Sequence, residues 1–173
     1  MLSLSDNEFS VVNFLVRNFT EKLTIRSIAQ RLSFSPAGVF NILKKLEKQG
    51  IVIGQKLGTG LFYSINFESR IAGHLAAIVL LHSDEKTDKI NLEQLKQAKS
   101  AIFDKKSLLL VTDSITALDI AMPNINVISM TEDDLTALFR KKDPEALQLL
   151  KKGIVLFGED RIVEIIKNCI SRF

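Results

Sequence analysis

Apolar residues recur at helical spacing in the first third of the chain, and each such run follows a helix-start signal. Ser5-Asp6-Asn7-Glu8 has the spacing of a capping box, in which the serine and glutamate side chains each accept a backbone N–H. A first helix is therefore expected over about residues 5–18. A second helix is expected from Thr24, and a third from Ser35-Pro36, where proline at the first helical position loses no hydrogen bond. The inward positions are Val12, Leu15, Val16 and Phe19, then Ile25, Ile28, Ala29 and Leu32, then Val39, Leu43 and Leu46.

The pattern changes after Gly50, the residue expected to end the third helix. Residues 51–56 and 61–66 are rich in β-branched and aromatic side chains, and they are joined by Leu57-Gly58-Thr59-Gly60. Two such runs around a glycine-bearing loop predict a β-hairpin. The order is therefore three helices followed by a hairpin, which is the order of a winged helix.

This part of the chain resembles the recognition helix and wing entry of MarR-like and ArsR-like DNA-binding regulators. The likeness is carried by Leu32-Ser33-Phe34-Ser35-Pro36-Ala37-Gly38-Val39 and by Leu43-Lys44-Lys45-Leu46-Glu47-Lys48-Gln49-Gly50-Ile51-Val52. The resemblance covers about residues 5–66. It implies a winged-helix domain over residues 1–68 that binds double-stranded DNA through its third helix.

The third helix presents polar and basic positions on the side opposite its core residues. Asn41 is suited to contact a base edge, and Lys44, Lys45 and Lys48 are suited to contact phosphates. The alternative is that these lysines only keep the helix surface soluble. Family members usually have a small polar residue and an arginine after the core valine, where this chain has Phe40 and Asn41. Phe40 is open to three interpretations: a core residue, a contact with a thymine methyl group, or a contact with a protein. The predicted DNA-binding residues are Arg26, Ser35, Ala37, Gly38, Asn41, Lys44, Lys45, Lys48, Lys56 and Thr59.

A nearly all-apolar helix is expected over residues 67–83. In a water-soluble protein, a helix that is apolar on all sides is expected to be buried against another domain or a second subunit. His74 and His82 lie in or beside it without a cysteine or a carboxylate pair, so they are expected to be structural and not metal ligands. The charged residues 83–91 are expected to be a linker, which makes residues 69–91 the connection between two domains. The predicted homodimer interface consists of Ile71, Leu75, Ile78 and Val79.

Helical and strand-like patterns alternate over residues 92–173, which form the predicted second domain. Helices are expected at 92–103, 114–121, 131–140, 143–153 and 159–170, and strands at 107–112, 125–130 and 154–158. Alternation of this kind predicts a small α/β domain with a short mixed sheet of three strands. The fold class of the whole chain is therefore α/β, or α+β when the winged helix is included.

The second domain resembles the minimal nucleotidyltransferase domain that follows a winged helix in some archaeal proteins. The likeness is carried by Asn126-Val127-Ile128-Ser129, the helix from Thr131, Asp143-Pro144-Glu145 and Gly153-Ile154-Val155-Leu156-Phe157-Gly158. Active members have a Gly-Ser pair after one strand and two alternating aspartates that hold the metal. Here the corresponding strand ends in Asp113-Ser114, and only Asp119 follows before the next strand. The resemblance thus implies a degenerate domain with no catalytic residues, no metal ligands and no cofactor.

Charge and composition bear on the kind of partner and on the cellular location of the protein. The chain has 173 residues and a formal net charge of +3. Residues 1–68 contain eight Lys and Arg against five Asp and Glu, whereas the rest of the chain is neutral. The single cysteine, Cys169, cannot form an intramolecular disulfide. The longest apolar stretch is far below the roughly 20 residues of a membrane span, and no export signal precedes the first helix. A cytoplasmic protein without membrane contact is therefore expected.

These features predict a sequence-specific, DNA-binding transcriptional regulator that acts as a homodimer. Its second domain is expected to serve dimerisation, or to sense a ligand or partner. Two other classes stay open. One is a protein-interaction module similar to the toxin–antitoxin partners that derive from such transferases. In that case Phe40 and the second domain would bind another protein. The other is a residual nucleotidyltransferase.

Overall fold

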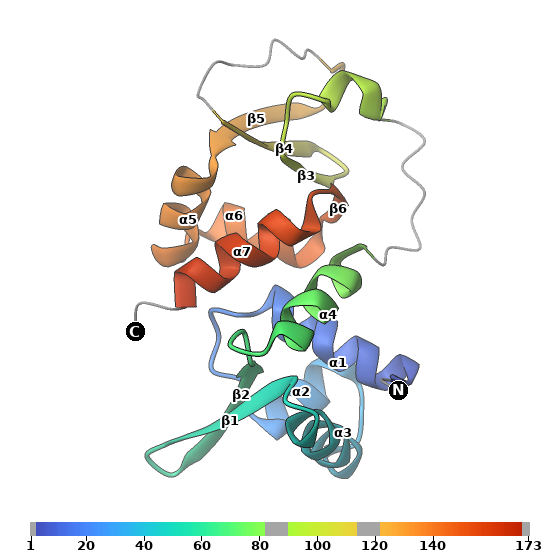
Figure 1. Ribbon diagram of the computed structural model, residues 1–173, viewed down its shortest axis with the longest axis vertical. Helices are drawn as coiled ribbons and strands as arrows, with labels where there is room; N and C mark the ends of the chain where they lie inside the picture. The colour runs from blue at the N-terminus through green and yellow to red at the C-terminus, as the bar shows by residue number, and fades with distance from the viewer. Residues whose placement is uncertain (1–2, 82–89, 114–121, 171–173) are drawn as a thin grey trace. The chain divides into compact units, whose positions relative to one another are not determined.

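The computed structural model describes residues 3–81, 90–113 and 122–170, which form a mixed α+β structure (Figure 1). Its contacts divide the chain into two compact units, Met1–Val79 and Leu80–Phe173. None of the described helices is long and apolar enough to cross a membrane.

The first unit contains the three helices and the hairpin that the sequence predicts. Each helix begins at the expected cap: Ser5 forms a capping box with Glu8, Thr24 forms one with Ser27, and Ser35 accepts a hydrogen bond from the Gly38 N–H at 3.0 Å. The elements are α1 (Asp6–Arg17), α2 (Ile25–Leu32), α3 (Pro36–Lys48), β1 (Val52–Leu57), β2 (Gly60–Ile65) and α4 (Arg70–Leu81).

The core of the helical part is formed by the inward faces of α1, α2 and α3. Burial of an aliphatic side chain of this size contributes about 1.5–3 kcal/mol, so this set supplies much of the stability of the unit. Ala29 of α2 is also buried, and its small side chain lets α2 and α3 approach closely. The fully buried side chains include Val11, Val12, Leu15, Val16, Ile28, Val39, Leu43 and Leu46.

Two left-handed residues end α2 and α3. Ser33 has φ 57° and lies in the tight turn between these helices, where the Phe34 N–H donates to the Ala29 carbonyl at 2.9 Å. Gly50 has φ +70°, and the N–H groups of Gly50 and Ile51 bond to carbonyls of the last turn of α3. This is the Schellman arrangement, which favours glycine because other side chains are strained at positive φ.

The β1–β2 hairpin is antiparallel in register from Val52 opposite Ile65 to Leu57 opposite Gly60. Leu23 forms an isolated β-bridge to β2, in which its carbonyl accepts from the Tyr63 N–H at 2.8 Å. In Figure 1 the hairpin extends away from α2 and α3 as a long two-stranded arm. The first unit is therefore a winged helix.

The second unit contains a four-stranded mixed sheet in the order β5-β4-β3-β6. Strands β4 and β5 are parallel, and β3 is antiparallel to both β4 and β6. Figure 1 shows α5, α6 and α7 together on one side of this sheet. The elements are the 3₁₀ turn η1 (Leu92–Leu95), β3 (Ser100–Asp104), β4 (Ser107–Thr112), β5 (Asn126–Thr131), α5 (Glu132–Arg140), α6 (Pro144–Lys152), β6 (Ile154–Phe157) and α7 (Glu159–Ile170).

The expected helix over residues 92–103 is wrong. Only Leu92–Leu95 forms a short 3₁₀ turn, and Ser100–Asp104 is β3, one of the two inner strands of the sheet. The leucine and alanine spacing resembles a helical face, but the buried run Ala101-Ile102-Phe103 pairs with β4 on one side and β6 on the other. Long-range pairing therefore outweighs the local pattern, and the sheet has four strands where the sequence predicts three. The expected helix at 114–121 lies outside the described residues.

Alternation along β4 separates the two faces of the sheet. Leu108 and Leu110 point into a buried cluster with Ala101, Phe103 and the η1 residue Leu95. The intervening Leu109 points to the opposite face, as the two-residue period of a strand requires. The sheet is therefore packed on both faces, and the helices cover only one of them.

The two glycines that flank β6 are required by close backbone packing. A Cβ at Gly153 would collide with the Leu149 carbonyl, and one at Gly158 would collide with Lys99 and Ser100. Gly158 also has φ +71° and forms the turn from β6 into α7. The glycine at 158 is thus explained by its contact with the start of β3.

Candidate nucleic-acid interface

Helix α3 has a buried side and an open side. Val39, Leu43 and Leu46 are fully buried and fix the rotation of the helix. The open side carries Ala37, Phe40, Asn41, Lys44 and Lys48, all of which are exposed. A helix anchored in this way can present its open side to the major groove of DNA, which is wide enough to admit one.

The first turn of α3 has its cap already satisfied. The Ser35 hydroxyl accepts the Gly38 N–H, and Pro36 has no N–H to satisfy. Gly38 is half-buried, and an added Cβ would lie 3.0 Å from Ser35 Oγ. Ser35 and Gly38 therefore shape the start of the helix, and Ala37 is exposed in this turn next to Pro36.

Phe40 is not a core residue, because 46% of its surface is exposed. Lys44 lies one helical turn away, and its Nζ is 6.0 Å from the centre of the Phe40 ring. This is the outer limit of a cation–π contact. Two of the three interpretations of Phe40 remain, a contact with DNA or with a protein.

Lys45 differs from the other lysines of α3. Its Nζ lies 2.6 Å from Oε1 of Glu8 on α1, whose side chain is only 8% exposed. Burial disfavours the charged form of Glu8, but hydrogen bonds from Lys45 and from the Ser5 N–H more than offset this and lower the pKa of the carboxyl. Lys45 therefore joins α3 to α1, whereas in the part of the chain that the structure describes neither Lys44 nor Lys48 has an ion-pair partner.

The one carboxylate of α3 is turned away from this open side. Glu47 accepts a hydrogen bond from the Gly54 N–H of β1 at 3.1 Å. This contact ties the end of the helix to the base of the hairpin. The open side of α3 is thus basic and polar without an acidic side chain.

The flanking candidates lie on two other elements. Arg26 is exposed in the first turn of α2, and Lys56 and Thr59 are exposed near the tip of the hairpin. Arg31, at the other end of α2, is held by Glu21 and by the Asn18 Oδ1 at 2.8 Å. Arg31 therefore has a structural role, while Arg26 is accessible to a ligand.

Helix α4 corrects part of the predicted dimer interface. Ile71 and Ile78 are each 53% exposed, but Leu75 and Val79 are buried within the chain. After the exposed first residue, Arg70, the exposed positions are Ile71, His74, Ile78 and Leu81, whose spacings alternate between three and four residues along one side of the helix. Leu75 and Val79 are on the other side and are not available to a second subunit.

The second unit does not gather a catalytic set among its described residues. Lys99 forms an ion pair with Asp113 and lies 3.8 Å from Glu132, and the hydrogen bond to Asp113 is the main reason that the pKa of Lys99 is raised. Asp134 caps α5 through Thr131, which lowers its pKa. No three His, Cys, Asp or Glu side chains in the described ranges are placed to hold a metal ion. Ser114, Asp119 and His82 lie outside those ranges.

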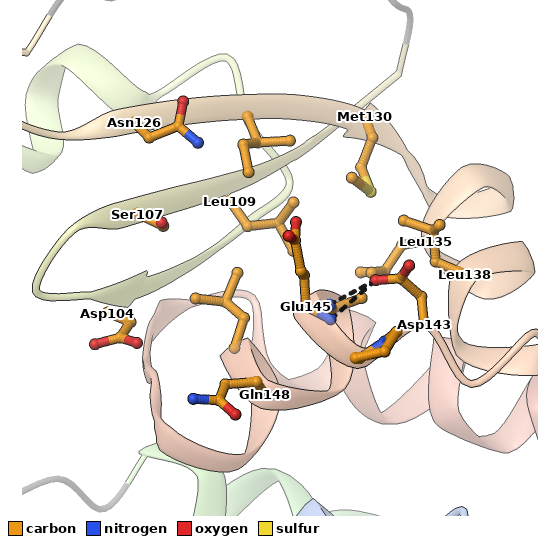
Figure 2. Close-up of a pocket in the computed structure, with 14 residues that line it drawn as sticks. Asp104, Ser107, Leu109, Asn126, Met130, Leu135, Leu138, Asp143, Glu145 and Gln148 are labelled. Atoms are coloured by element: carbon orange, nitrogen blue, oxygen red, sulfur yellow. Dashed lines mark hydrogen bonds between the residues drawn. The ribbon is translucent and has the colours of Figure 1, made fainter.

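A cavity of about 640 Å³ lies in the second unit, and nothing in the sequence pattern predicts it. It opens between the β4–β5 part of the sheet and helices α5 and α6 (Figure 2). Its lining includes residues of two motifs that carry the nucleotidyltransferase resemblance: Asn126 and Ile128 of β5, and Asp143, Pro144 and Glu145 at the start of α6. Strand alternation identifies the residues of each face, but only tertiary packing shows which part of a face is left uncovered.

The comparison with protein families concerns the first unit. Residues 2–57 match the model of the MarR family, which spans α1 to the end of β1. None of the curated proteins matches the chain. Among solved structures, the chain is similar to CymR (YrzC), the global cysteine regulator of B. subtilis, with 17% identity and a TM-score of 0.32, over 54% of this chain and 78% of that one. The MarR-like part of the predicted resemblance is thus confirmed.

Proposed function

We propose that this protein is a DNA-binding transcriptional regulator whose first unit contacts double-stranded DNA through α3 and the β1–β2 hairpin. The observation that carries the proposal is the open side of α3, where exposed Asn41, Lys44 and Lys48 face away from a fully buried core. The match of residues 2–57 to the MarR family supports it. The positive balance of the chain also lies in this unit.

The residues divide into two groups by the kind of contact they make. Asn41 reads a base edge, for which its amide is suited by carrying both a donor and an acceptor. Lys44 and Lys48 contact phosphates on either side, and Arg26, Lys56 and Thr59 add flanking contacts from α2 and the hairpin. Lys45 contributes through the position of α3, because its ammonium group is already paired with Glu8. Most of the affinity therefore comes from phosphate contacts, and specificity depends on few side chains.

A homodimer doubles the number of DNA contacts and so compensates for the few that each subunit makes. The exposed stripe Ile71, His74, Ile78 and Leu81 of α4 has the spacing of a coiled-coil seam, in which the same helix of a second copy packs against it. A symmetric dimer places two α3 helices on half-sites about 34–36 Å apart. The expected operator is therefore an inverted repeat.

The second unit is proposed to be a degenerate nucleotidyltransferase-like domain that senses a ligand or partner. Strand β5 carries no carboxylate, and Asp113 is paired with Lys99. No catalytic role is proposed for Asp113 or Lys99.

Selection of genomic fragments by the purified full chain tests this function. The selection is made at about 150 mM salt, where the Debye length is about 8 Å and much non-specific binding is suppressed. The expected result is enrichment of fragments that share one inverted repeat, with tighter binding to that repeat than to a scrambled duplex. Equal binding to both duplexes, or no binding to either, contradicts the proposal.

A further inference from the structure

The cavity of the second unit has an apolar interior. Its floor is formed by Leu109 of β4 with Ile128 and Met130 of β5, and α5 adds Leu135 and Leu138 as one wall. The volume of about 640 Å³ lies within the ~300–1,000 Å³ of small-molecule sites. Leu109 and Leu135 are buried, whereas Ile128, Met130 and Leu138 are only partly buried. Water in contact with the open surface of these last three side chains is unfavourable, so an apolar body gains free energy by displacing it.

The polar lining of the cavity is acidic on balance. Asp104, Asp143 and Glu145 contribute three carboxylates, and Ser107, Asn126 and Gln148 are neutral. No lysine, arginine or histidine is among the lining residues that the structure describes. An anionic ligand would therefore meet only like charge, which excludes a nucleoside triphosphate from this cavity.

The carboxylates differ in what they already bind. Oδ1 of Asp143 caps α6 and accepts the N–H groups of Glu145 and Ala146 at 3.1 and 2.9 Å. The side chain of Glu145 extends from the first turn of α6 towards the sheet, near Leu109 (Figure 2). No described side chain forms a hydrogen bond or ion pair with that carboxylate. Glu145 is thus the charged group that faces the apolar floor and is open to a ligand.

We propose that this cavity binds a small organic cation, an amine attached to an aromatic or aliphatic body. The body lies on Leu109, Ile128 and Met130, and the ammonium group pairs with Glu145. Ser107, Asn126 and Gln148 supply neutral hydrogen-bond partners on the rim. Binding itself is independent of DNA, whereas its use as a regulatory signal rests on the proposed function.

Methyl NMR of the full chain tests binding directly, because the protein has only three methionines. Met130 lines the cavity, while Met122 packs against the cluster on the opposite face of the sheet. The chain is labelled at the methionine methyl groups and titrated without DNA. The probes are tryptamine, neutral 3-ethylindole and anionic indole-3-propionate, which share one ring system and differ in charge.

The expected result is a shift of the Met130 signal with an unmoved Met122 signal, and tighter binding of tryptamine than of indole-3-propionate by at least about fivefold. The variant Glu145→Gln keeps the shape of the side chain and is expected to weaken tryptamine about three- to fivefold while leaving 3-ethylindole unchanged. Asp160→Asn is the matched control, since Asp160 is the exposed second residue of α7 as Glu145 is of α6. It is expected to bind all three probes as the wild type does.

Three results overturn the inference: no Met130 shift with any probe, equal binding of the amine and the carboxylate, or an unaltered tryptamine affinity in Glu145→Gln. None of them bears on DNA binding, because the titration contains no DNA. Conversely, a protein that binds no operator but gives the expected methyl shifts retains this site and loses only the proposed function.

Discussion

Glu8 Oε1 and Lys45 Nζ lie 2.6 Å apart, and this ion pair joins the capping box of α1 to the last turn of α3. The same carboxylate accepts the Ser5 N–H at 2.9 Å through its other oxygen. A buried acid thus caps the start of α1 and also holds α3. This arrangement separates Lys45 from the lysines that are proposed to contact DNA.

Replacing Lys45 with alanine is expected to lower the free energy of unfolding by about 1 kcal/mol, because it leaves the Glu8 carboxylate buried with one partner fewer. Lys48→Ala is the control, since Lys48 is exposed on the same helix and lacks an ion pair among the described residues. Urea denaturation of both variants measures the difference. Equal stability of the two variants would show that the Glu8–Lys45 pair does not support the fold.

The lowered pKa of Glu8 gives the pair a defined pH dependence. A carboxyl whose pKa is lower in the folded state adds stability above its unfolded pKa, and this is lost as the pH falls through the folded value. The wild type should therefore lose stability below about pH 4.5 more steeply than Glu8→Gln, whose side chain does not ionise. Thermal unfolding between pH 3 and pH 7 measures this. Parallel curves for the two proteins would contradict the prediction.

Local signals account for what the sequence predicted well. Ser5, Thr24 and Ser35 cap helices through groups within three residues, so their effect is visible in the sequence. The local sequence does not reveal strand β3, because its stability depends on β4 and β6, and β6 begins some fifty residues later. Hydrophobicity alone, from which the α4 interface is predicted, does not distinguish buried Leu75 from exposed Ile78. The cavity could not be foreseen, because it depends on the uncovered part of a sheet face.

Replacing Gly158 and Gly73 with alanine is expected to change the free energy of unfolding in opposite directions. Gly158→Ala is expected to destabilise the protein by more than about 2 kcal/mol, because the new Cβ would collide with the start of β3 at a residue with positive φ. Gly73→Ala, within α4, meets no atom within 4 Å and is expected to stabilise by about 0.5–1 kcal/mol. Chemical denaturation compares both with the wild type. A harmless Gly158→Ala would remove the packing explanation for that glycine.

The proposed dimer depends on the exposed stripe of α4. Ile78→Glu introduces a charge into a self-complementary seam, so the two copies should separate into monomers. Leu92→Glu is the matched control, because Leu92 is exposed to a similar extent but lies outside α4. Sedimentation equilibrium is expected to show a dimer for the wild type and the control, and a monomer for Ile78→Glu. A dimeric Ile78→Glu would place the interface elsewhere.

The salt dependence of DNA binding tests the central claim most directly. The variant Lys44→Ala/Lys48→Ala removes two exposed lysines from α3, and Lys105→Ala/Lys106→Ala removes two exposed lysines from the β3–β4 turn with the same change in net charge. The slope of log affinity against log salt is measured for the wild type and both variants on one duplex. The α3 variant is expected to reduce the magnitude of this slope by about two units, or about 0.9 for each lost phosphate contact, while the control keeps the wild-type slope. An unchanged slope for Lys44→Ala/Lys48→Ala, or an equal reduction in both variants, would contradict DNA binding through the open side of α3.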